Sequence, residues 1–159
     1  AHIAGVKLIL AGQFMSENYK QELMDMPEYS CVDYRGYCSR QEIEQIYRDS
    51  NVGIATVLNI GQYEIQSNLL TKTYEYMAMG LPVIANDSVG IRRVNDIYNF
   101  ALVVDPSDSE KISNAIMYLK NNPETAKCMG NNGKRAINEK YNWEREEKKL
   151  ICLYEEVLK

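Results

Sequence analysis

Residues 68–85 read Asn-Leu-Leu-Thr-Lys-Thr-Tyr-Glu-Tyr-Met-Ala-Met-Gly-Leu-Pro-Val-Ile-Ala, and this stretch decides the fold of the chain. Its middle part predicts a helix that carries Tyr74, Met77 and Ala78. Gly80 is expected to end this helix, because glycine is the usual residue just past a helix C-terminus. Pro82 cannot continue the helix, and the residue before a proline prefers extended geometry. Residues 83–85 then favour a strand, so the stretch predicts a loop, a helix and a strand in that order.

Similar units extend in both directions along the chain. Apolar or β-branched segments that favour strands occupy residues 6–10, 30–34, 52–58, 83–85 and 100–104. The first of them is a short apolar run, which is typical of a strand that is buried on both faces. Because helices are expected between the strands, the sequence predicts an α/β fold, a Rossmann-like doubly wound parallel sheet flanked by helices.

Capping residues mark the expected helix starts. Ser39 and Glu42 form a capping box, in which each side chain satisfies a free amide of the helix end, and they predict a helix over residues 40–49. Other helices are predicted at residues 17–24, after Ser107 with Glu110 as its cap, from Asn122-Pro123, and from Asn142 to the chain end. Gly130 and Gly133 are expected to punctuate the helix that starts at residue 123.

Composition narrows the class of protein. The chain has 159 residues, which suits one globular domain. Its net charge of -4 gives no overall attraction to the phosphate backbone, so nucleic acid is not expected as the main partner. The four cysteines are scattered and the single histidine is His2, so a zinc site is not expected. No apolar run reaches the roughly 18 residues that span a bilayer. We expect a cytoplasmic protein with reduced cysteines; peripheral association of a longer parent with the inner face of a membrane stays open.

The residues just before the helix of the quoted stretch favour the binding of an anion. Residues 59–71 form a long polar loop that leads into a helix N-terminus, where unpaired amides and the helix dipole attract phosphate. Leu69, Leu70 and Thr71 would supply such amides. Lys72 adds a cation in the first turn, where positive charge opposes the dipole and needs a compensating reason. A bound diphosphate would be one.

The stretch from Lys72 to Ile84 resembles the signature of retaining GT-B glycosyltransferases of family 4, also called group 1. That pattern is a lysine, a glutamate three residues later, Tyr-Met-Ala, one variable residue and Gly-x-Pro-Val-Ile, and all of it is present. The resemblance extends over the whole chain. It implies the C-terminal, donor-binding domain of a two-domain enzyme, one half of a GT-B fold with its first strand missing, with residues 1–159 as a single nucleotide-sugar-binding domain.

The resemblance implies roles for individual residues. The counterpart of Glu75 binds the ribose hydroxyls of the donor nucleotide, the amides of Leu69 to Thr71 would hold its diphosphate, and Tyr37 lies where the family receives the nucleobase. The donor would be a UDP- or GDP-linked sugar, and the acceptor of this polysaccharide or glycoconjugate synthesis would lie on a missing N-terminal domain. The last helix, residues 143–159, would pack toward that domain. The fragment alone is expected to be inactive.

Two departures from the family pattern limit these implications. The family often has a glutamate eight residues before the ribose-binding one, and that position is Ser67 here. Ser67 and Asn68 could bind sugar hydroxyls as neutral groups, with a different sugar preference. Family members also begin this domain with an arginine and a lysine that neutralise the leaving phosphate. This chain starts after both, so we expect the catalytic residues to lie outside it.

Plainer interpretations stay open for each feature. Lys72 and Glu75 could form a surface ion pair, since they are three residues apart on a helix. Ser67 and Asn68 could cap that helix without touching a ligand. A sugar-nucleotide epimerase of GT-B architecture and a non-catalytic nucleotide-binding module are the alternative functions, because a fold does not fix a function. No Asp-x-Asp pair is present, so no metal is expected.

Overall fold

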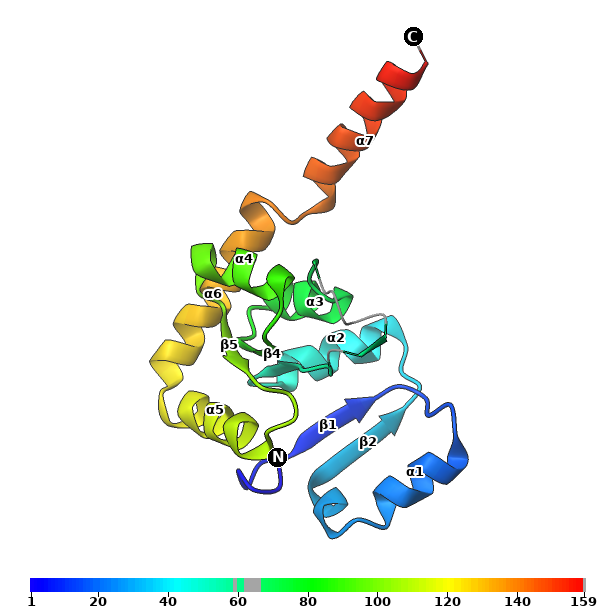
Figure 1. Cartoon of the computed structure of the whole chain (residues 1–159), viewed down its shortest axis with the longest axis vertical. Coiled ribbons are helices and arrows are strands. Elements are labelled where there is room, and N and C mark those ends of the chain that lie inside the picture. Colours follow the sequence, from blue (N-terminus) through cyan, green and yellow to red (C-terminus); the bar gives the residue numbers. More distant parts are fainter. Residues whose placement is uncertain (59, 62–66, 159) are drawn as a thin grey trace.

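The computed structural model describes residues 1–58, 60–61 and 67–158 (Figure 1). Residues 59 and 62–66 of the loop predicted at residues 59–71 therefore lie outside the described residues. The elements along the chain are β1 (Leu8–Ala11), α1 (Glu17–Met24), the 3-10 helix η1 (Pro27–Cys31), β2 (Val32–Gly36), α2 (Arg40–Asp49), β3 (Gly53–Ala55), α3 (Thr71–Met79), β4 (Val83–Asn86), α4 (Val89–Tyr98), β5 (Ala101–Val104), α5 (Ser109–Asn121), α6 (Pro123–Glu139) and α7 (Trp143–Val157).

All paired strands are parallel and are flanked by helices, which confirms the predicted fold class. β4 lies between β3 and β5 in a three-stranded sheet, and β1 pairs with β2 in a sheet of their own. The hydrogen-bonded strands thus divide into two sheets, where one was expected. β1 is also only half-buried, although its apolar sequence indicated burial on both faces. Its partner β2 carries Asp33 and Arg35, and Lys7 pairs with Asp33, so this small sheet has a polar face.

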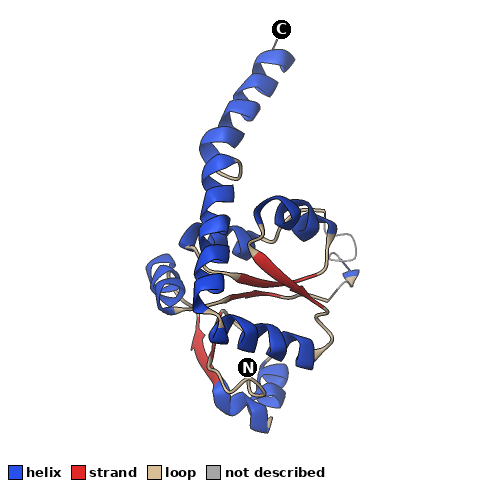
Figure 2. Ribbon diagram, turned by 90° about the vertical axis from the view of Figure 1, so that its left-hand side faces the viewer, coloured by secondary structure: helices blue, strands red, loops and turns tan. Residues whose placement is uncertain are grey.

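The core lies on both faces of the larger sheet, and β4 is its centre. All four residues of β4 are buried. Val83 and Ala85 face a cluster that contains Met77 of α3 and residues of α4 and α6. Ile84 points to the opposite face, because side chains alternate along a strand, and it packs in a cluster with α5. Figure 2 shows the strands of this sheet between helices, which is the layering expected of a doubly wound fold.

Several local predictions are confirmed. α2 begins at Arg40 behind the capping box, in which the Ser39 side chain accepts from the Glu42 amide and the Glu42 carboxylate accepts from the Ser39 amide. α3 ends at Gly80, which has the left-handed backbone angle φ 77°. Asn142 caps α7 by accepting from the amide of Arg145.

The prediction that Gly130 and Gly133 interrupt a helix is wrong. Both lie inside α6, which runs continuously from Pro123 to Glu139. A Cβ on Gly130 would lie 2.0 Å from the carbonyl oxygen of Gly80, and a Cβ on Gly133 would lie 3.2 Å from the Cα of Met77. These glycines therefore let α6 approach the C-terminal half of α3 closely.

Two smaller predictions also differ from the structure, and one helix was not located from the sequence. The cap of α5 is Asp108, which accepts from the amide of Lys111, whereas Ser107 donates its hydroxyl to Asp105. The second strand begins at Val32, because Ser30 belongs to η1. α4 was not predicted at all, although Ser88 caps it by accepting from the amide of Ile91. Residues 89–98 include several polar residues, so the apolar face of this helix was not recognised in the sequence.

The last helix, α7, projects away from the rest of the molecule in both views (Figures 1 and 2). None of its residues from Trp143 to Val157 is buried. In the described part of the chain, no helix is long and apolar enough to cross a membrane.

Candidate functional site

At the N-terminus of α3, Thr71 is exposed, and Leu70 and Lys72 are half-buried. The N-cap residue of α3 is Leu70, in extended conformation, and no side chain of the described residues caps the first turn with a hydrogen bond. The first amides of a helix have no partner within the helix. The prediction that Ser67 or Asn68 caps this helix is therefore wrong, since both precede the N-cap and are exposed. Thr71 is exposed as well. The amide of Thr73 donates to the carbonyl of Leu70, whereas no acceptor among the described residues pairs with the amides of Thr71 and Lys72.

Lys72, in the same turn, is half-buried, and burial lowers the pKa of its ammonium group. Within the described residues no ion pair joins Lys72 to Glu75 or to any other carboxylate, so the surface ion pair considered from the sequence is not formed. A desolvated cation beside unpaired amides is an arrangement that favours an anion, because each group gains electrostatic energy when a negative charge enters.

Glu75 is held by a residue that sequence reasoning did not single out as a site residue. The hydroxyl of Tyr47, on α2, donates to Oε2 of Glu75 at 2.7 Å. The Tyr47 ring packs edge-on against the ring of Tyr76, with centroids 5.3 Å apart. Burial and the Glu75 carboxylate raise the pKa of Tyr47, so its hydroxyl stays a donor. Tyr47 is half-buried on α2, and nothing close to it in the sequence indicates that Glu75 is its partner.

The segment before α3 is held by α4. Leu69 is buried in the core, and Oδ1 of Asn68 accepts from Nη2 of Arg93 at 3.3 Å. A Cβ on Gly90 would lie 2.6 Å from the backbone carbonyl carbon and oxygen of Asn68. Only glycine therefore lets α4 approach the segment this closely. These contacts could not be anticipated, because α4 itself was not predicted.

Tyr37 lies in the loop after β2 and is 77% exposed. The left-handed Gly36, with φ 64°, precedes it at the end of the strand. Among the described residues no hydrogen bond or ring contact joins Tyr37 to the N-terminus of α3. The structure thus brings Glu75, Lys72, Thr71, Leu70, Leu69 and Asn68 together around one helix end, with Ser67 just before them, but does not bring Tyr37 into contact with them.

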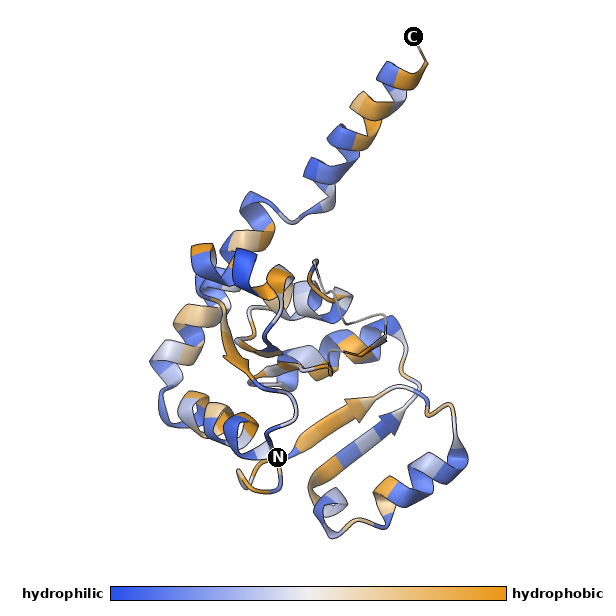
Figure 3. Ribbon diagram, viewed as in Figure 1, coloured by the Kyte–Doolittle hydropathy of each residue, from blue (hydrophilic) through white to orange (hydrophobic). Residues whose placement is uncertain are grey.

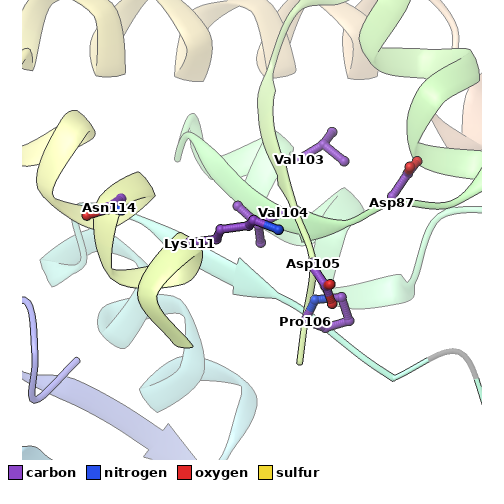
Figure 4. A pocket seen from close by; sticks show the side chains of 7 residues that line it. All are labelled: Asp87, Val103, Val104, Asp105, Pro106, Lys111 and Asn114. Atoms are coloured by element: carbon purple, nitrogen blue, oxygen red, sulfur yellow. The ribbon is translucent and has the colours of Figure 1, made fainter. Parts of the chain in front are cut away.

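A separate cavity of about 650 Å³ opens at the carboxyl ends of β4 and β5 (Figure 4). Its lining residues are Asp87, Val103, Val104, Asp105, Pro106, Lys111 and Asn114. The guanidinium of Arg92 pairs with Asp87 and holds the pKa of that carboxyl below its usual range. Hydrogen bonds from Ser107 do the same for the pKa of Asp105. No site residue predicted from the sequence lines this cavity, and both of its carboxylates already have partners.

The family model of the group 1 glycosyl transferases matches residues 1–122. The chain belongs to this family. The same family was expected from residues 72–84, and this expectation is confirmed. No curated protein matches the sequence significantly.

Solved structures show the same fold. Sucrose-phosphate synthase from Thermosynechococcus elongatus is 22% identical and superposes with a TM-score of 0.78 over 99% of this chain and 40% of its own. The Anabaena protein HepE in complex with UDP-glucose is 14% identical, with a TM-score of 0.78 over 98% of this chain and 43% of its own. HepE in complex with UDP is 16% identical, with a TM-score of 0.74 over 95% and 41%. The expected GT-B fold is confirmed, and the chain spans about 40% of the length of these proteins.

Proposed function

We propose that this chain is the donor-binding half of a glycosyltransferase that moves a sugar from a UDP- or GDP-linked donor to an acceptor. The observation that carries the proposal is the first turn of α3, where uncapped amides, the half-buried Lys72 and the oriented carboxylate of Glu75 meet. Family membership supports it, and so do the complexes of HepE with UDP and with UDP-glucose, since they superpose on this chain.

Each group has a chemical task in this proposal. The amides of residues 69–71 and the ammonium of Lys72 bind the diphosphate, whose negative charge grows as the sugar leaves. An anion also compensates for the burial of the Lys72 ammonium. The Glu75 carboxylate accepts from the two vicinal ribose hydroxyls. Ser67 and Asn68 lie next to this helix end and bind hydroxyls of the donor sugar as neutral groups. Tyr37 stacks on the nucleobase from the loop after β2.

The acceptor and the remaining catalytic groups belong to a longer parent protein. In this proposal an N-terminal domain holds the acceptor, and an arginine and a lysine outside this chain neutralise the leaving diphosphate, so the chain alone transfers no sugar. The parent acts in the cytoplasm or at the inner face of a membrane, in polysaccharide or glycoconjugate synthesis. No divalent ion takes part in nucleotide binding by this half; a requirement for Mg²⁺ in the titration below would contradict this point.

The last helix is the part of the chain that we propose to contact the N-terminal domain. Large apolar side chains of α7 are exposed, although such residues are usually buried. They are Trp143, Leu150, Ile151, Leu153, Tyr154 and Val157. Figure 3 shows hydrophobic and hydrophilic segments alternating along the ribbon of the projecting helix. An amphipathic helix without a buried residue fits a surface of the proposed N-terminal domain.

A calorimetric titration with UDP, GDP and ADP tests the donor site, both in this chain and in the longer parent. We expect one diphosphate to bind and Glu75→Gln to weaken it by about tenfold, because a hydrogen bond to a charged group contributes about 1.5–3 kcal/mol. Glu139→Gln is the matched control, since Glu139 also accepts from a tyrosine hydroxyl, that of Tyr98, on another part of the molecule. Equal affinities of the Glu75 variant and the wild type would contradict the proposed role of Glu75. Binding without sugar transfer by the parent would favour a non-catalytic module.

A further inference from the structure

We propose that Tyr47 is a positioning residue of the donor site, which fixes the carboxylate of Glu75 for the ribose hydroxyls. This inference rests on the proposed function, because it concerns the same site. It adds a residue of α2 that lies 28 positions before Glu75 in the sequence and that belongs to no motif in the chain.

The contact between the two side chains is short and well supported. The Tyr47 hydroxyl lies 2.7 Å from Oε2 of Glu75, and both residues are half-buried. The Tyr47 ring is held edge-on by Tyr76, at an interplanar angle of 81°, and the Tyr76 hydroxyl donates to the carbonyl of Ile54 at 3.4 Å. A chain of contacts thus runs from β3 through α3 to the hydroxyl of Tyr47, and this leaves the phenol little freedom.

The geometry of a carboxylate explains what the hydroxyl contributes. An ionised carboxylate has two oxygens and about four acceptor positions. Tyr47 takes one position on Oε2 and leaves Oε1, together with the second position on Oε2, for two vicinal hydroxyls. A glutamate that is free in solution must lose rotamer freedom when it binds. Tyr47 has already removed part of that freedom, so less of the binding energy is lost in ordering Glu75.

Packing alone does not require the hydroxyl. The ring of Tyr47 makes the contact with Tyr76, and phenylalanine would keep that contact, while water can reach the half-buried carboxylate of Glu75. The substitution Tyr47→Phe therefore removes the hydrogen bond and preserves the packing between α2 and α3. This separates a positioning role from a structural one.

The test compares two ligands that differ only in the ribose hydroxyls. The affinities of the longer parent protein for UDP and 2′,3′-dideoxy-UDP are measured by calorimetry for the wild type and for Tyr47→Phe, or with the GDP pair if GDP binds more tightly. We expect the wild type to prefer UDP, and Tyr47→Phe to reduce this preference by about 3- to 10-fold. The affinity for the dideoxy ligand should stay within about twofold. Tyr98→Phe, which removes the hydrogen bond to Glu139, should leave the preference unchanged.

The possible results separate this inference from the proposed function. If the wild type prefers UDP and Tyr47→Phe keeps the full preference, the positioning role of Tyr47 is overturned and that of Glu75 stands. If Tyr47→Phe weakens both ligands equally and lowers the melting temperature, Tyr47 is only structural, which also overturns the inference. A wild type that binds both ligands equally well overturns the ribose-binding role of Glu75 and this inference with it.

Discussion

Both sheets consist of parallel strands, but the sheet of β3, β4 and β5 differs from the sheet of β1 and β2 in its burial. Every residue of β4 is buried between layers of helices, whereas every residue of β1 is half-buried and β2 carries charged residues. Figure 3 shows an apolar β1 next to a mostly hydrophilic β2. The proposed diphosphate and ribose groups lie on the densely packed part, and the proposed nucleobase contact lies on the open part.

This difference indicates which part of the proposed site contributes most to donor affinity. α3 is fixed by α6 through Gly130 and Gly133, and its preceding segment is fixed by α4 through Gly90. Groups that are held in place before binding lose little freedom when a ligand enters. Tyr37, in the loop after β2, is exposed and has no ring contact among the described residues. We therefore expect most of the donor affinity to come from the first turn of α3.

The largest effect is expected where two elements of the packed part touch. In Gly130→Ala, the new Cβ would lie 2.0 Å from the carbonyl oxygen of Gly80, so α6 or the end of α3 must shift. Overpacking costs about 1–3 kcal/mol, and alanine returns up to about 1 kcal/mol through its better helix propensity. We expect a net loss of about 1–2 kcal/mol in the free energy of unfolding, measured with denaturant. The adjacent Asn131→Ala, at an exposed site, should change it by less than about 0.5 kcal/mol.

A smaller effect is expected at the contact between α4 and the segment before α3. A Cβ at position 90 would displace Asn68, because it would lie 2.6 Å from its carbonyl group. Gly90→Ala should therefore weaken diphosphate binding by about 3- to 10-fold in calorimetry, in addition to a stability loss of about 1 kcal/mol. Val89→Ala, one residue away and exposed, serves as control. Unchanged affinity in a destabilised Gly90→Ala protein would show that this contact supports the fold and not the site.

The smallest effect is expected on the open sheet. Lys7 and Arg35 hold the pKa of Asp33 below its ordinary value of 3.8. A carboxyl whose pKa is lowered by folding stabilises the protein above its unfolded pKa, and this contribution is lost as the pH falls through the folded value. Asp33→Asn should therefore lower stability slightly at pH 6 and by a smaller amount at pH 3, because the contribution of the ion pair is lost as the pH falls below 3.8 toward the lowered pKa of Asp33. Denaturant unfolding at both pH values measures this, with Asp96→Asn as a control for the lost charge. An equal effect at both pH values would contradict the ion-pair account.

Most of the sequence-based predictions that were correct concern features that depend on residues close together in the chain. The capping box of Ser39 and Glu42, the helix end at Gly80 and the cap at Asn142 each need only neighbours within one turn. The family signature of residues 72–84 also lies within one helix and the strand that follows it. For these reasons the fold class, most helix starts and the residues around α3 could be predicted.

The remaining features depend on contacts between distant elements. Gly130 was expected to interrupt a helix, because the residues around it give no sign that the backbone of Gly80, 50 positions earlier, packs against it. The contact of Tyr47 with Glu75 and that of Gly90 with Asn68 likewise join different elements. The division of the strands into two sheets has a similar origin, since local sequence does not specify which strands pair.

We propose that the donor diphosphate binds at the first turn of α3, and the amide chemical shifts of this turn report on such binding. In a titration of the isotope-labelled protein with UDP and GDP, the account predicts that one ligand shifts the amide signals of Leu70, Thr71 and Lys72. The signals of α7 should stay in place. Shifts that instead gather around Asp87 and Asp105 would place the ligand in the cavity at the ends of β4 and β5, and this would contradict the account.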